Sequence, residues 1–337
     1  MRVVIAGGGI GGLTLAAALQ GDSSITVVEK RSEVSGIGAG LLLHDAALSH
    51  LKNAGIEVSG RRFNQMNLGL ANGRSLPSVK KAGLAISRPA LHGFLLSACD
   101  GVDFRTSTVV ESFKEDGSGV DIRLSDGCEL RADLLIGADG LGSDIRRLHG
   151  AKTRRRYSGV TCWRALSQSD SSEDNPIEIC GHGQRVGIVP LERGTYLYLT
   201  ESAAPNQSRI PAPIERFSHF SYDAPSLIES VSRDDWTHHD LDELDLHYWG
   251  TARVPLLGDA AHGFTPNLGE GAAQAILDAA LLAQSLRSGE LYPGHRRRVN
   301  SRIAFLSRWM GRIAQANGWA GMLRDITLRP IASKRTT

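Results

Sequence analysis

Apolar runs separated by glycine-rich turns organise the chain, and the first of them predict a β-α-β unit. The β-branched run at 2–6 predicts a buried strand, the Ala/Leu-rich stretch 13–19 a helix, and residues 25–28 a second strand. Two later apolar runs, 134–137 and 254–258, also end in glycines and predict further strands. The glycines at 269–271 open a long apolar helix. This order predicts a parallel, Rossmann-like sheet.

The middle of the chain changes to short strands. We predict strands at 157–166, 177–180, 185–190 and 195–200. Period-2 alternation in the last of these puts Tyr196, Tyr198 and Thr200 on one face and the two leucines on the other. Such a sheet could use its polar face for a substrate, or could simply have one face in water; the pattern allows both.

The last part of the chain is loop-like and then helical. Residues 201–216 predict a loop, 218–236 a short helix, and 296–313 a basic helix. Its apolar residues recur at helical spacing, namely Ile303, Leu306, Trp309, Met310 and Ile313. A basic amphipathic helix could touch a membrane or a nucleic acid. We favour a helix that packs these residues on the rest of the protein and leaves its basic face in water.

Composition narrows the class of protein. Length of 337 residues predicts about two domains. With 38 basic and 36 acidic residues, 22% charged and 41% apolar, the chain is too apolar for disorder and too near neutral for wholesale nucleic-acid binding. Its four cysteines form no CxxC pair, so we expect no zinc site and a reducing, cytoplasmic location. No run of 18 apolar residues is present, so we expect no stable membrane insertion.

Several histidines have the residue type for metal binding or catalysis but also suit structural positions. His238 and His239 precede an acidic stretch, but adjacent histidines converge poorly on one ion, so we expect a solvated linker there and no metal. His182, between glycines, is expected in a hairpin. The residue type of His262 allows chemistry, but we expect a structural role.

The glycine-rich N-terminus carries the first chemistry. Arg2 and the apolar stretch 3–19 resemble a secretory signal, but the five glycines and the strand that follows favour a nucleotide-binding loop. Gly7 permits the tight turn, Gly9 lets the backbone approach a pyrophosphate, and Gly12 lets helix and strand pack. Glu29 ends the second strand, where a carboxylate accepts hydrogen bonds from an adenosine ribose. The loop predicts an adenine dinucleotide but does not distinguish NAD from FAD.

Two further motifs make that distinction. Residues 134–146 contain GADGxxSxxR, and residues 254–279 contain GDAAHxxxPxxGxG. With the three motifs in this order, the chain resembles the FAD-dependent aromatic-ring hydroxylases, single-component flavoprotein monooxygenases with the para-hydroxybenzoate hydroxylase fold. Its central strands resemble those of the urate and salicylate hydroxylase branch, and the resemblance runs from residue 1 to about 330.

This resemblance implies an α/β fold, in which a Rossmann-like FAD-binding domain is interleaved with a mixed β-sheet substrate domain and followed by a C-terminal helix. The FAD-binding domain is expected at 1–70, 88–156 and 253–290. The substrate domain is expected at 71–87 and 157–252, and the C-terminal helical region at 291–337.

The resemblance also implies which residues bind FAD. These are Gly7, Gly9, Gly12, Glu29, Lys30, Arg88, Val110, Asp139, Asp259, Gly269, Glu270, Gly271, Ala272 and Ala273. The backbone amides of the last five would face the pyrimidine end of the flavin, where the positive helix terminus favours the anionic reduced ring. Position 270 is usually Gln in the family, and a carboxylate there opposes that anion unless it points away.

The implied reaction is hydroxylation of an aromatic or N-heteroaromatic small molecule, such as a phenolic acid, purine, quinolone or polyketide. NAD(P)H reduces the flavin, and dioxygen adds to form a flavin hydroperoxide that donates its distal oxygen. Only one GxGxxG is present, so NAD(P)H is expected to visit transiently. Arg164, Tyr196 and Tyr198 are the candidate catalytic side chains, although Arg164 also suits a surface strand.

Two alternatives remain open. A flavoprotein of the same fold could act as a reductase or as a non-hydroxylating ligand-binding relative, because the motifs report cofactor binding and not oxygen transfer. A plain NAD dehydrogenase leaves the Asp259 segment unexplained. We expect a monomer or a homodimer.

Overall fold

A four-stranded parallel sheet forms the centre of the nucleotide-binding part of the molecule. The computed structural model describes residues 1–34, 40–205, 212, 214–245, 247–289 and 294–327. The sheet has the order β10-β1-β2-β6 and consists of β1 (Arg2–Ala6), β2 (Ser24–Val28), β6 (Asp103–Arg105) and β10 (Leu134–Gly137). β1 lies in the middle, paired in parallel with both β2 and β10. The two strands at its centre are therefore buried on both faces, as their continuous apolar runs predict.

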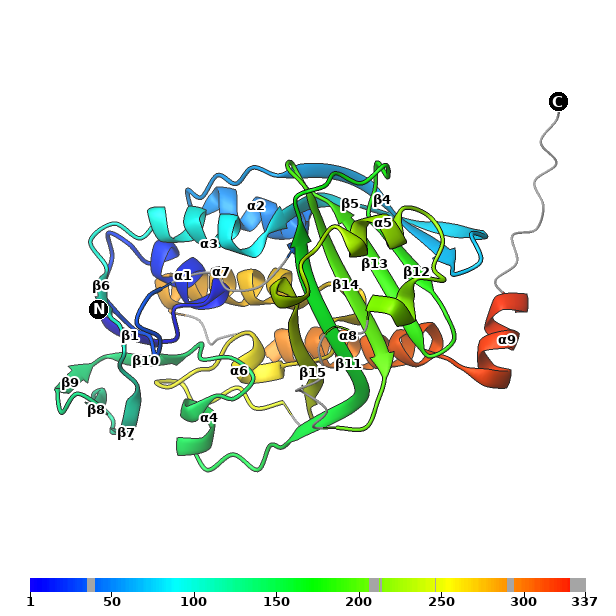
Figure 1. Ribbon diagram of the computed structural model, residues 1–337. Helices are drawn as coiled ribbons and strands as arrows, with labels where there is room; N and C mark the ends of the chain where they lie inside the picture. Colours follow the sequence, from blue (N-terminus) through cyan, green and yellow to red (C-terminus); the bar gives the residue numbers. More distant parts are fainter. Residues whose placement is uncertain (35–39, 206–211, 213, 246, 290–293, 328–337) are drawn as a thin grey trace.

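Four helices cover one face of this sheet (Figure 1). They are α1 (Ile10–Ala18), α2 (Asp45–Asn53), α3 (Arg88–Ser97) and α7 (Gly271–Ser288). The other face packs on a small antiparallel sheet of β7 (Val110–Glu115), β8 (Val120–Leu124) and β9 (Glu129–Ala132) and on the short helices α4 (Asp144–Leu148) and α6 (Asp259–His262). The predicted β-α-β unit and the long helix after the 269–271 glycines are confirmed.

A mixed eight-stranded sheet forms the second part, in the order β15-β11-β14-β13-β12-β4-β5-β3. Its strands are β3 (Gly40–His44), β4 (Arg61–Leu70), β5 (Ser75–Ser87), β11 (Arg155–Ser167), β12 (Ile177–Cys180), β13 (Gln184–Pro190), β14 (Thr195–Ser202) and β15 (Thr237–Leu244). The sheet is mixed because β12 and β4 are parallel while its other pairs are antiparallel. The four strands predicted in the middle of the chain are confirmed, and the fold class with them.

The predicted alternation along β14 is confirmed, but neither face of this strand is wet. Leu197 and Leu199 are buried beneath α5 (Ala224–Glu229) and the 3-10 helix η1 (Ile214–Phe217). On the other face, Tyr196 is buried in a cluster with Phe63 and Val189. The alternative of a solvated face at β14 is therefore wrong.

Three segments differ from the sequence-based expectation. β3 and β4 both belong to the large sheet, where each pairs with β5. The expected domain boundary puts residues 1–70 with the nucleotide-binding part instead. Residues 254–257 form only an isolated bridge beside β10, because Pro255 has no N–H to donate to a ladder. Residues 237–244, including His239, are the edge strand β15 and not a linker. His182 does lie in the β12–β13 turn, as predicted.

Two helices close the chain, α8 (Gly294–Ala314) and α9 (Gly318–Thr327), with α9 at the far end of the molecule (Figure 1). The expectation that α8 packs its apolar residues inward is wrong for Leu306, Trp309 and Met310, which are exposed. Buried Arg296 and Ser307 face the protein instead, because each finds a polar partner there. Among the described helices, none has the length and apolarity needed to cross a bilayer.

Candidate active site

The three predicted glycines of the first loop meet three different surroundings. Gly7 has φ +108°, and a Cβ on it would lie 2.4 Å from the carbonyl oxygen of Ala138. A Cβ on Gly12 would lie 2.0 Å from the Gly7 carbonyl oxygen, so this glycine allows α1 to pack on the turn. A Cβ on Gly9 would meet nothing within 4 Å, because this residue borders a cavity at the N-terminus of α1. A helix N-terminus beside open space suits a phosphate group.

That cavity has a volume of about 340 Å³ and runs along the carboxyl ends of the parallel strands. It brings together predicted cofactor residues from all three motifs and from the segments between them. Those that line it are Gly7, Gly9, Glu29, Lys30, Arg88, Val110, Asp139 and Asp259. Ligands bind at this edge in open α/β sheets.

Glu29 extends from the end of β2 toward the glycine loop. Its Oε2 accepts a hydrogen bond from the amide of Gly8 at 2.8 Å, and its Oε1 accepts one from the amide of Arg31 at 3.0 Å. These bonds hold the carboxylate at the cavity wall. Val110, the first residue of β7, lines the same wall.

Asp139 supplies a buried acceptor with one free oxygen. Its Oδ2 accepts from the amides of Asp144 at 2.7 Å and Ile145 at 3.1 Å, and so caps α4. Its Oδ1 is buried without a hydrogen-bond partner among the described residues. Burial raises the pKa of this carboxyl. A buried oxygen left unpaired at a cavity wall is expected to meet a donor on a ligand, so the cavity fits a nucleotide cofactor.

Arg88 and Asp259 also line the cavity. Arg88 begins α3 directly after its N-cap Ser87, and Asp259 begins α6 after Gly258, which has φ +57°. Burial lowers the pKa of Arg88, and the charge of Asp259 opposes that shift. The positive charge of Arg88 and the negative charge of Asp259 are therefore near each other beside the expected cofactor.

Sequence reasoning missed two residues that stabilise this site. His92 lies one turn after Arg88 on α3, and its Nε2 hydrogen-bonds the Gly8 carbonyl oxygen at 2.8 Å. Arg146, the last residue of GADGxxSxxR, donates to the carbonyl of Ala260 at 2.7 Å and so links the second and third motifs. The i, i+4 spacing from Arg88 could have indicated His92; no sequence signal identified the partner of Arg146.

Behind Asp259, a buried polar cluster fixes the third motif. Asp278 on α7 accepts from the Gly258 amide at 3.0 Å, from Arg296 at 2.7 Å, and pairs with His262. His262 and Asp278 are fully buried. The expected structural role of His262 matches this position.

The predicted residues Gly269, Glu270, Gly271, Ala272 and Ala273 do not line the cavity; neither does Gly12. Gly269 and Glu270 lie just before α7, and residues 271–273 form its first turn. Glu270 accepts from Lys81 Nζ at 2.8 Å and pairs with His44 Nε2 at 3.1 Å. Burial alone raises the pKa of Glu270, but the hydrogen bonds from His44 and Lys81 outweigh it and lower the pKa to about 2. The positive charge of Lys81 therefore compensates the negative charge of Glu270.

Of the three catalytic candidates, Arg164 and Tyr196 lie together. Arg164 has a buried Nε without a hydrogen-bond partner in the described part of the chain. Burial raises the pKa of Tyr196 to about 12, while the charge of Arg164 acts in the opposite direction. The Arg164 charge also lowers the pKa of Arg88, which lines the cavity. Neither residue lines the cavity; Arg164 belongs to β11 and Tyr196 to β14, and Arg164 is near enough to Arg88 for their charges to interact.

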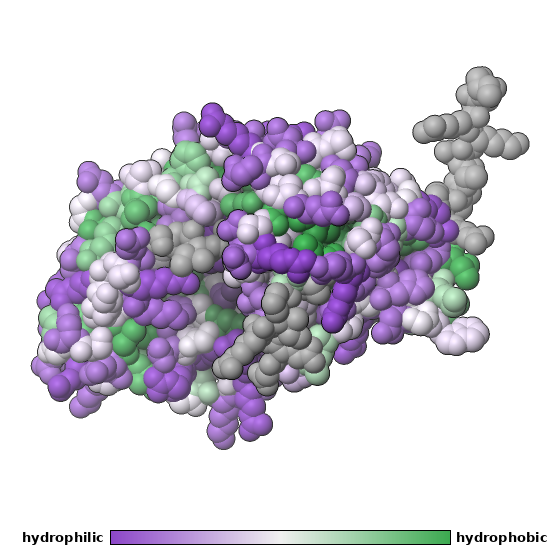
Figure 2. Space-filling model, viewed as in Figure 1, coloured by the Kyte–Doolittle hydropathy of each residue, from purple (hydrophilic) through white to green (hydrophobic). Residues whose placement is uncertain are grey.

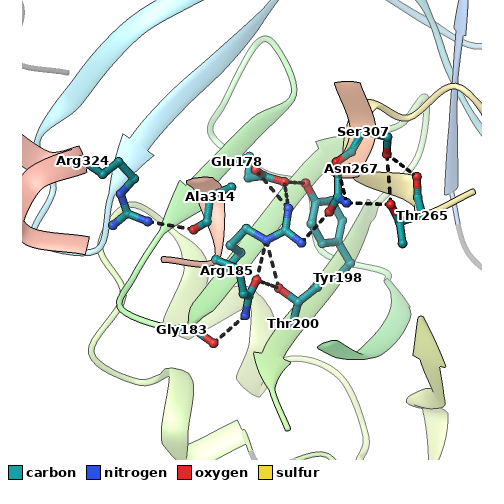
Figure 3. A network of polar contacts seen from close by, with 11 residues as sticks. Glu178, Gly183, Arg185, Tyr198, Thr200, Thr265, Asn267, Ser307, Ala314 and Arg324 are labelled. Carbon is teal, nitrogen blue, oxygen red and sulfur yellow. Dashed lines mark hydrogen bonds and ion pairs between the residues drawn. The ribbon is translucent and has the colours of Figure 1, made fainter. Parts of the chain in front are cut away.

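Tyr198, two residues further along β14, is engaged elsewhere. Its hydroxyl donates to Glu178 Oε2 at 2.7 Å (Figure 3). Its ring lies over Gly187, where a Cβ would come within 1.9 Å of it. Glu178 also pairs with the buried Arg185 at 3.4 Å. Arg185 in turn donates to Asn267 at 2.9 Å, in the loop before α7. This network connects the large sheet to the third motif.

The described residues hold no cluster of His, Cys, Asp or Glu suited to a metal ion. The expected absence of a metal site thus stays a prediction for the whole chain. Each of the four cysteines is free.

Comparisons with known proteins agree with this arrangement. A family described as FAD binding domain matches residues 1–298. The chain is 33% identical to the aurachin C monooxygenase/isomerase of Stigmatella aurantiaca, covering 99% of this chain and 95% of that protein. It is also 33% identical to the 2-heptyl-3-hydroxy-4(1H)-quinolone synthase of Pseudomonas aeruginosa, covering 99% and 96%. The crystal structure of Klebsiella pneumoniae HpxO complexed with FAD and uric acid superimposes with a TM-score of 0.85 at 24% identity, over 96% of this chain and 93% of that one.

Proposed function

Because this chain belongs to the FAD-dependent monooxygenases, we propose that it uses NAD(P)H and dioxygen to hydroxylate an aromatic or N-heteroaromatic small molecule. One observation carries the proposal: the cavity joins Gly9, Glu29, Asp139 and Asp259 from three separate motifs at one sheet edge. When bound, FAD supplies the redox chemistry and the activation of oxygen, while the protein supplies orientation and the exclusion of water.

We assign the cofactor contacts from these positions. The N-terminus of α1 at Gly9 would bind the pyrophosphate, since Gly9 borders the cavity and a helix N-terminus favours an anion. Glu29 would accept from the adenosine ribose, with Lys30 and Val110 beside the adenine. The unpaired Oδ1 of Asp139 and the carboxylate of Asp259 would accept from the ribityl chain.

The flavin ring would then extend from Asp259 toward the start of α7. Amides from Gly269 to Ala273 would face its pyrimidine end, where the helix dipole stabilises negative charge. Because the ammonium of Lys81 neutralises Glu270 and His44 lies within hydrogen-bond distance of it, its carboxylate does not cancel that effect. The departure from the usual Gln is therefore compatible with flavin reduction.

Arg164 and Tyr196 are our candidates for contact with substrate. The buried, unpaired Nε of Arg164 would donate to an acidic or carbonyl oxygen on the ring, and Tyr196 would orient the same ring from the next strand. Two relatives are named for quinolone or aurachin chemistry, which favours a bicyclic N-heteroaromatic substrate. Tyr198 would act through Glu178 and Arg185 and is assigned as a positioning residue.

A substrate panel tests the proposal. The FAD-loaded enzyme is given NADH or NADPH with quinolones, purines or phenolic acids, and NAD(P)H oxidation, peroxide and hydroxylated product are measured. We expect at least one N-heteroaromatic compound to yield product in step with NAD(P)H oxidation. Peroxide alone across the whole panel would instead favour the reductase or non-hydroxylating alternative.

Variants then test the substrate face. Arg164→Ala and Tyr196→Phe are expected to lower kcat/KM at least tenfold with flavin retained. Tyr157→Phe is the matched control, because it removes the same hydroxyl from the same sheet, where Tyr157 donates to the Ala203 carbonyl at 2.8 Å. If the two test variants behave like this control, the assigned substrate face is wrong. The assembly state and a cytoplasmic location remain predictions.

A further inference from the structure

The outer faces of α8 and α9 carry a concentration of exposed apolar side chains. Apart from Met1 and Val79, every large apolar side chain that is exposed among the described residues belongs to one of these two helices. The set, which we call the C-terminal apolar face, consists of Val299, Phe305, Leu306, Trp309, Met310, Trp319, Met322, Leu323 and Ile326. Trp319 is 85% exposed and Trp309 52%. Figure 2 shows apolar surface on the outer side of α9, at the right edge of that view. So dense a patch differs from singly scattered apolar residues, which need no explanation.

The spacing shows that these residues form stripes and not a random scatter. On α9, positions 319, 322, 323 and 326 follow the i, i+3, i+4, i+7 pattern of one helix face. On α8, positions 302, 305, 306, 309 and 310 follow the same repeat, with an arginine at 302. Each helix is thus amphipathic, with its apolar stripe turned to solvent.

The inner faces of both helices are polar and firmly held. On α8, Arg296 pairs with Asp278 at 2.7 Å, and Ser307 hydrogen-bonds the carbonyl oxygen of Thr265. On α9, Arg324 donates to the carbonyl of Ala314 at 2.7 Å (Figure 3). It also donates to the carbonyl of Gly181 at 3.1 Å. These contacts fix which face points outward, so the apolar stripes cannot turn inward without leaving buried arginines unpaired.

Charge is strongly asymmetric around this face. Residues 294–327 contain seven Arg residues against one Asp, a net charge of +6 in a chain whose total charge is +2. α8 contains no acidic residue at all. Arg297, Arg298, Arg302 and Arg312 on α8 are exposed next to the apolar stripe. A surface that is both apolar and cationic is complementary to one that is both apolar and anionic.

We propose that the C-terminal apolar face binds the surface of a membrane that contains anionic lipid. The helices would lie in the plane of the interface, with tryptophans and aliphatic side chains among the acyl chains and arginines at the headgroups. No spanning helix is needed for this mode of binding. A second copy fits the same face less well, because a two-fold interface would bring the arginines of one α8 against those of the other.

Vesicle sedimentation with the full-length, FAD-loaded protein tests the proposal. We expect sedimentation with phosphatidylcholine vesicles that contain phosphatidylglycerol, little with phosphatidylcholine alone, and weaker binding as salt is raised. Tryptophan emission should shift to the blue on binding, because Trp309 and Trp319 are exposed whereas Trp163, Trp236 and Trp249 are already buried.

The variant Trp319→Asp/Leu323→Asp should lower the partition coefficient at least tenfold. Val79→Asp is the matched control, since Val79 is an exposed apolar residue on β5, outside α8 and α9. Flavin content and melting temperature verify that each variant is folded, and basal NAD(P)H oxidation should be unchanged.

Three results would overturn the proposal. They are the absence of vesicle binding by the wild type, equal binding by the double variant, and a dimer that the double variant abolishes while vesicles are ignored. The last result would assign the face to a second copy. Retention on duplex DNA without vesicle binding is a case of the first result, and it would assign the face to a nucleic acid.

Discussion

Removing Lys81 should leave a negative charge without its main partner beside the start of α7. Lys81→Met keeps the length of the side chain but deletes the ammonium that lies 2.8 Å from Glu270 Oε1. Glu270 would retain His44 Nε2 at 3.1 Å and the uncharged amide of Gln274, whose Nε2 donates to Oε2 at 3.2 Å. Because the Nδ1 of His44 accepts from the amide of Ala47, its Nε2 carries the proton and donates to Glu270 in the neutral ring.

The size of the effect follows from the pKa of Glu270. A fall from an ordinary value of 4.5 to about 2 corresponds to about 3 kcal/mol of preference for the charged form in the folded protein. The side chains of Glu270 and Lys81 are 15% and 26% exposed, so screening by water reduces the part due to this pair to roughly 1–2 kcal/mol.

A double-mutant cycle of urea unfolding measures this coupling. Lys81→Met, Glu270→Gln and the double variant are compared with wild type at pH 7 with FAD in excess. We expect each single change to cost about 1–2 kcal/mol of unfolding free energy, and the double change to cost less than their sum. Additivity within about 0.5 kcal/mol would refute the pairing.

The pH dependence has a defined sign. The pKa of Glu270 is lower in the folded state than in the unfolded chain, so its stabilisation is complete above about pH 4.5 and is lost as the pH falls toward 2. The stability difference between wild type and Glu270→Gln should shrink over that range. Lys81→Met should also lower the flavin reduction potential, and Glu270→Gln in the same chain should restore it, if the carboxylate acts on the ring.

Three further predictions concern the site and its support. Asp259→Ala should purify with less than a tenth of the wild-type flavin per chain by absorbance, and full flavin content would contradict the assigned contact. Asp278→Asn should cost about 3–5 kcal/mol and lower the melting temperature, because it leaves His262 and Arg296 buried without their carboxylate; an unchanged melting curve would show that the cluster is dispensable. Burial, aided by Arg164, lowers the pKa of His239 to about 4, so protonation favours the unfolded chain and wild type should lose stability as the pH falls from about 6.5 toward 4. His239→Gln should remove part of that loss in a pH series of thermal unfolding, and parallel curves would contradict it.

The cofactor side was predictable because its determinants are local. The positive φ of Gly7 belongs to its own turn, Gly12 packs against Gly7 five residues earlier, and Glu29 follows directly from the end of β2. The alternation along β14 was predictable for the same reason, since a strand sets side-chain direction by itself.

What the sequence did not reveal depends on partners far along the chain. Arg146 meets Ala260, and the inward face of α8 is decided by Asp278 on another helix. The sequence left the Tyr198 hydroxyl available to a substrate, but in the structure it donates a hydrogen bond to Glu178 on β12. In each case a polar side chain finds a partner that no spacing rule could supply, and that partner decides which face is buried.

The position of β1 in its sheet has a consequence for biosynthesis. β1 pairs on one side with β2, which follows it closely in the chain, and on the other side with β10. During synthesis Val3 therefore has no partner on that second side until Leu134 has been made. A nascent chain that ends before β10 presents the apolar strand β1 with one edge unpaired, which is a template for aggregation. Fragments terminated before residue 134 should therefore require chaperones, whereas chains that extend past residue 137 can complete the central pairings of this sheet as they emerge.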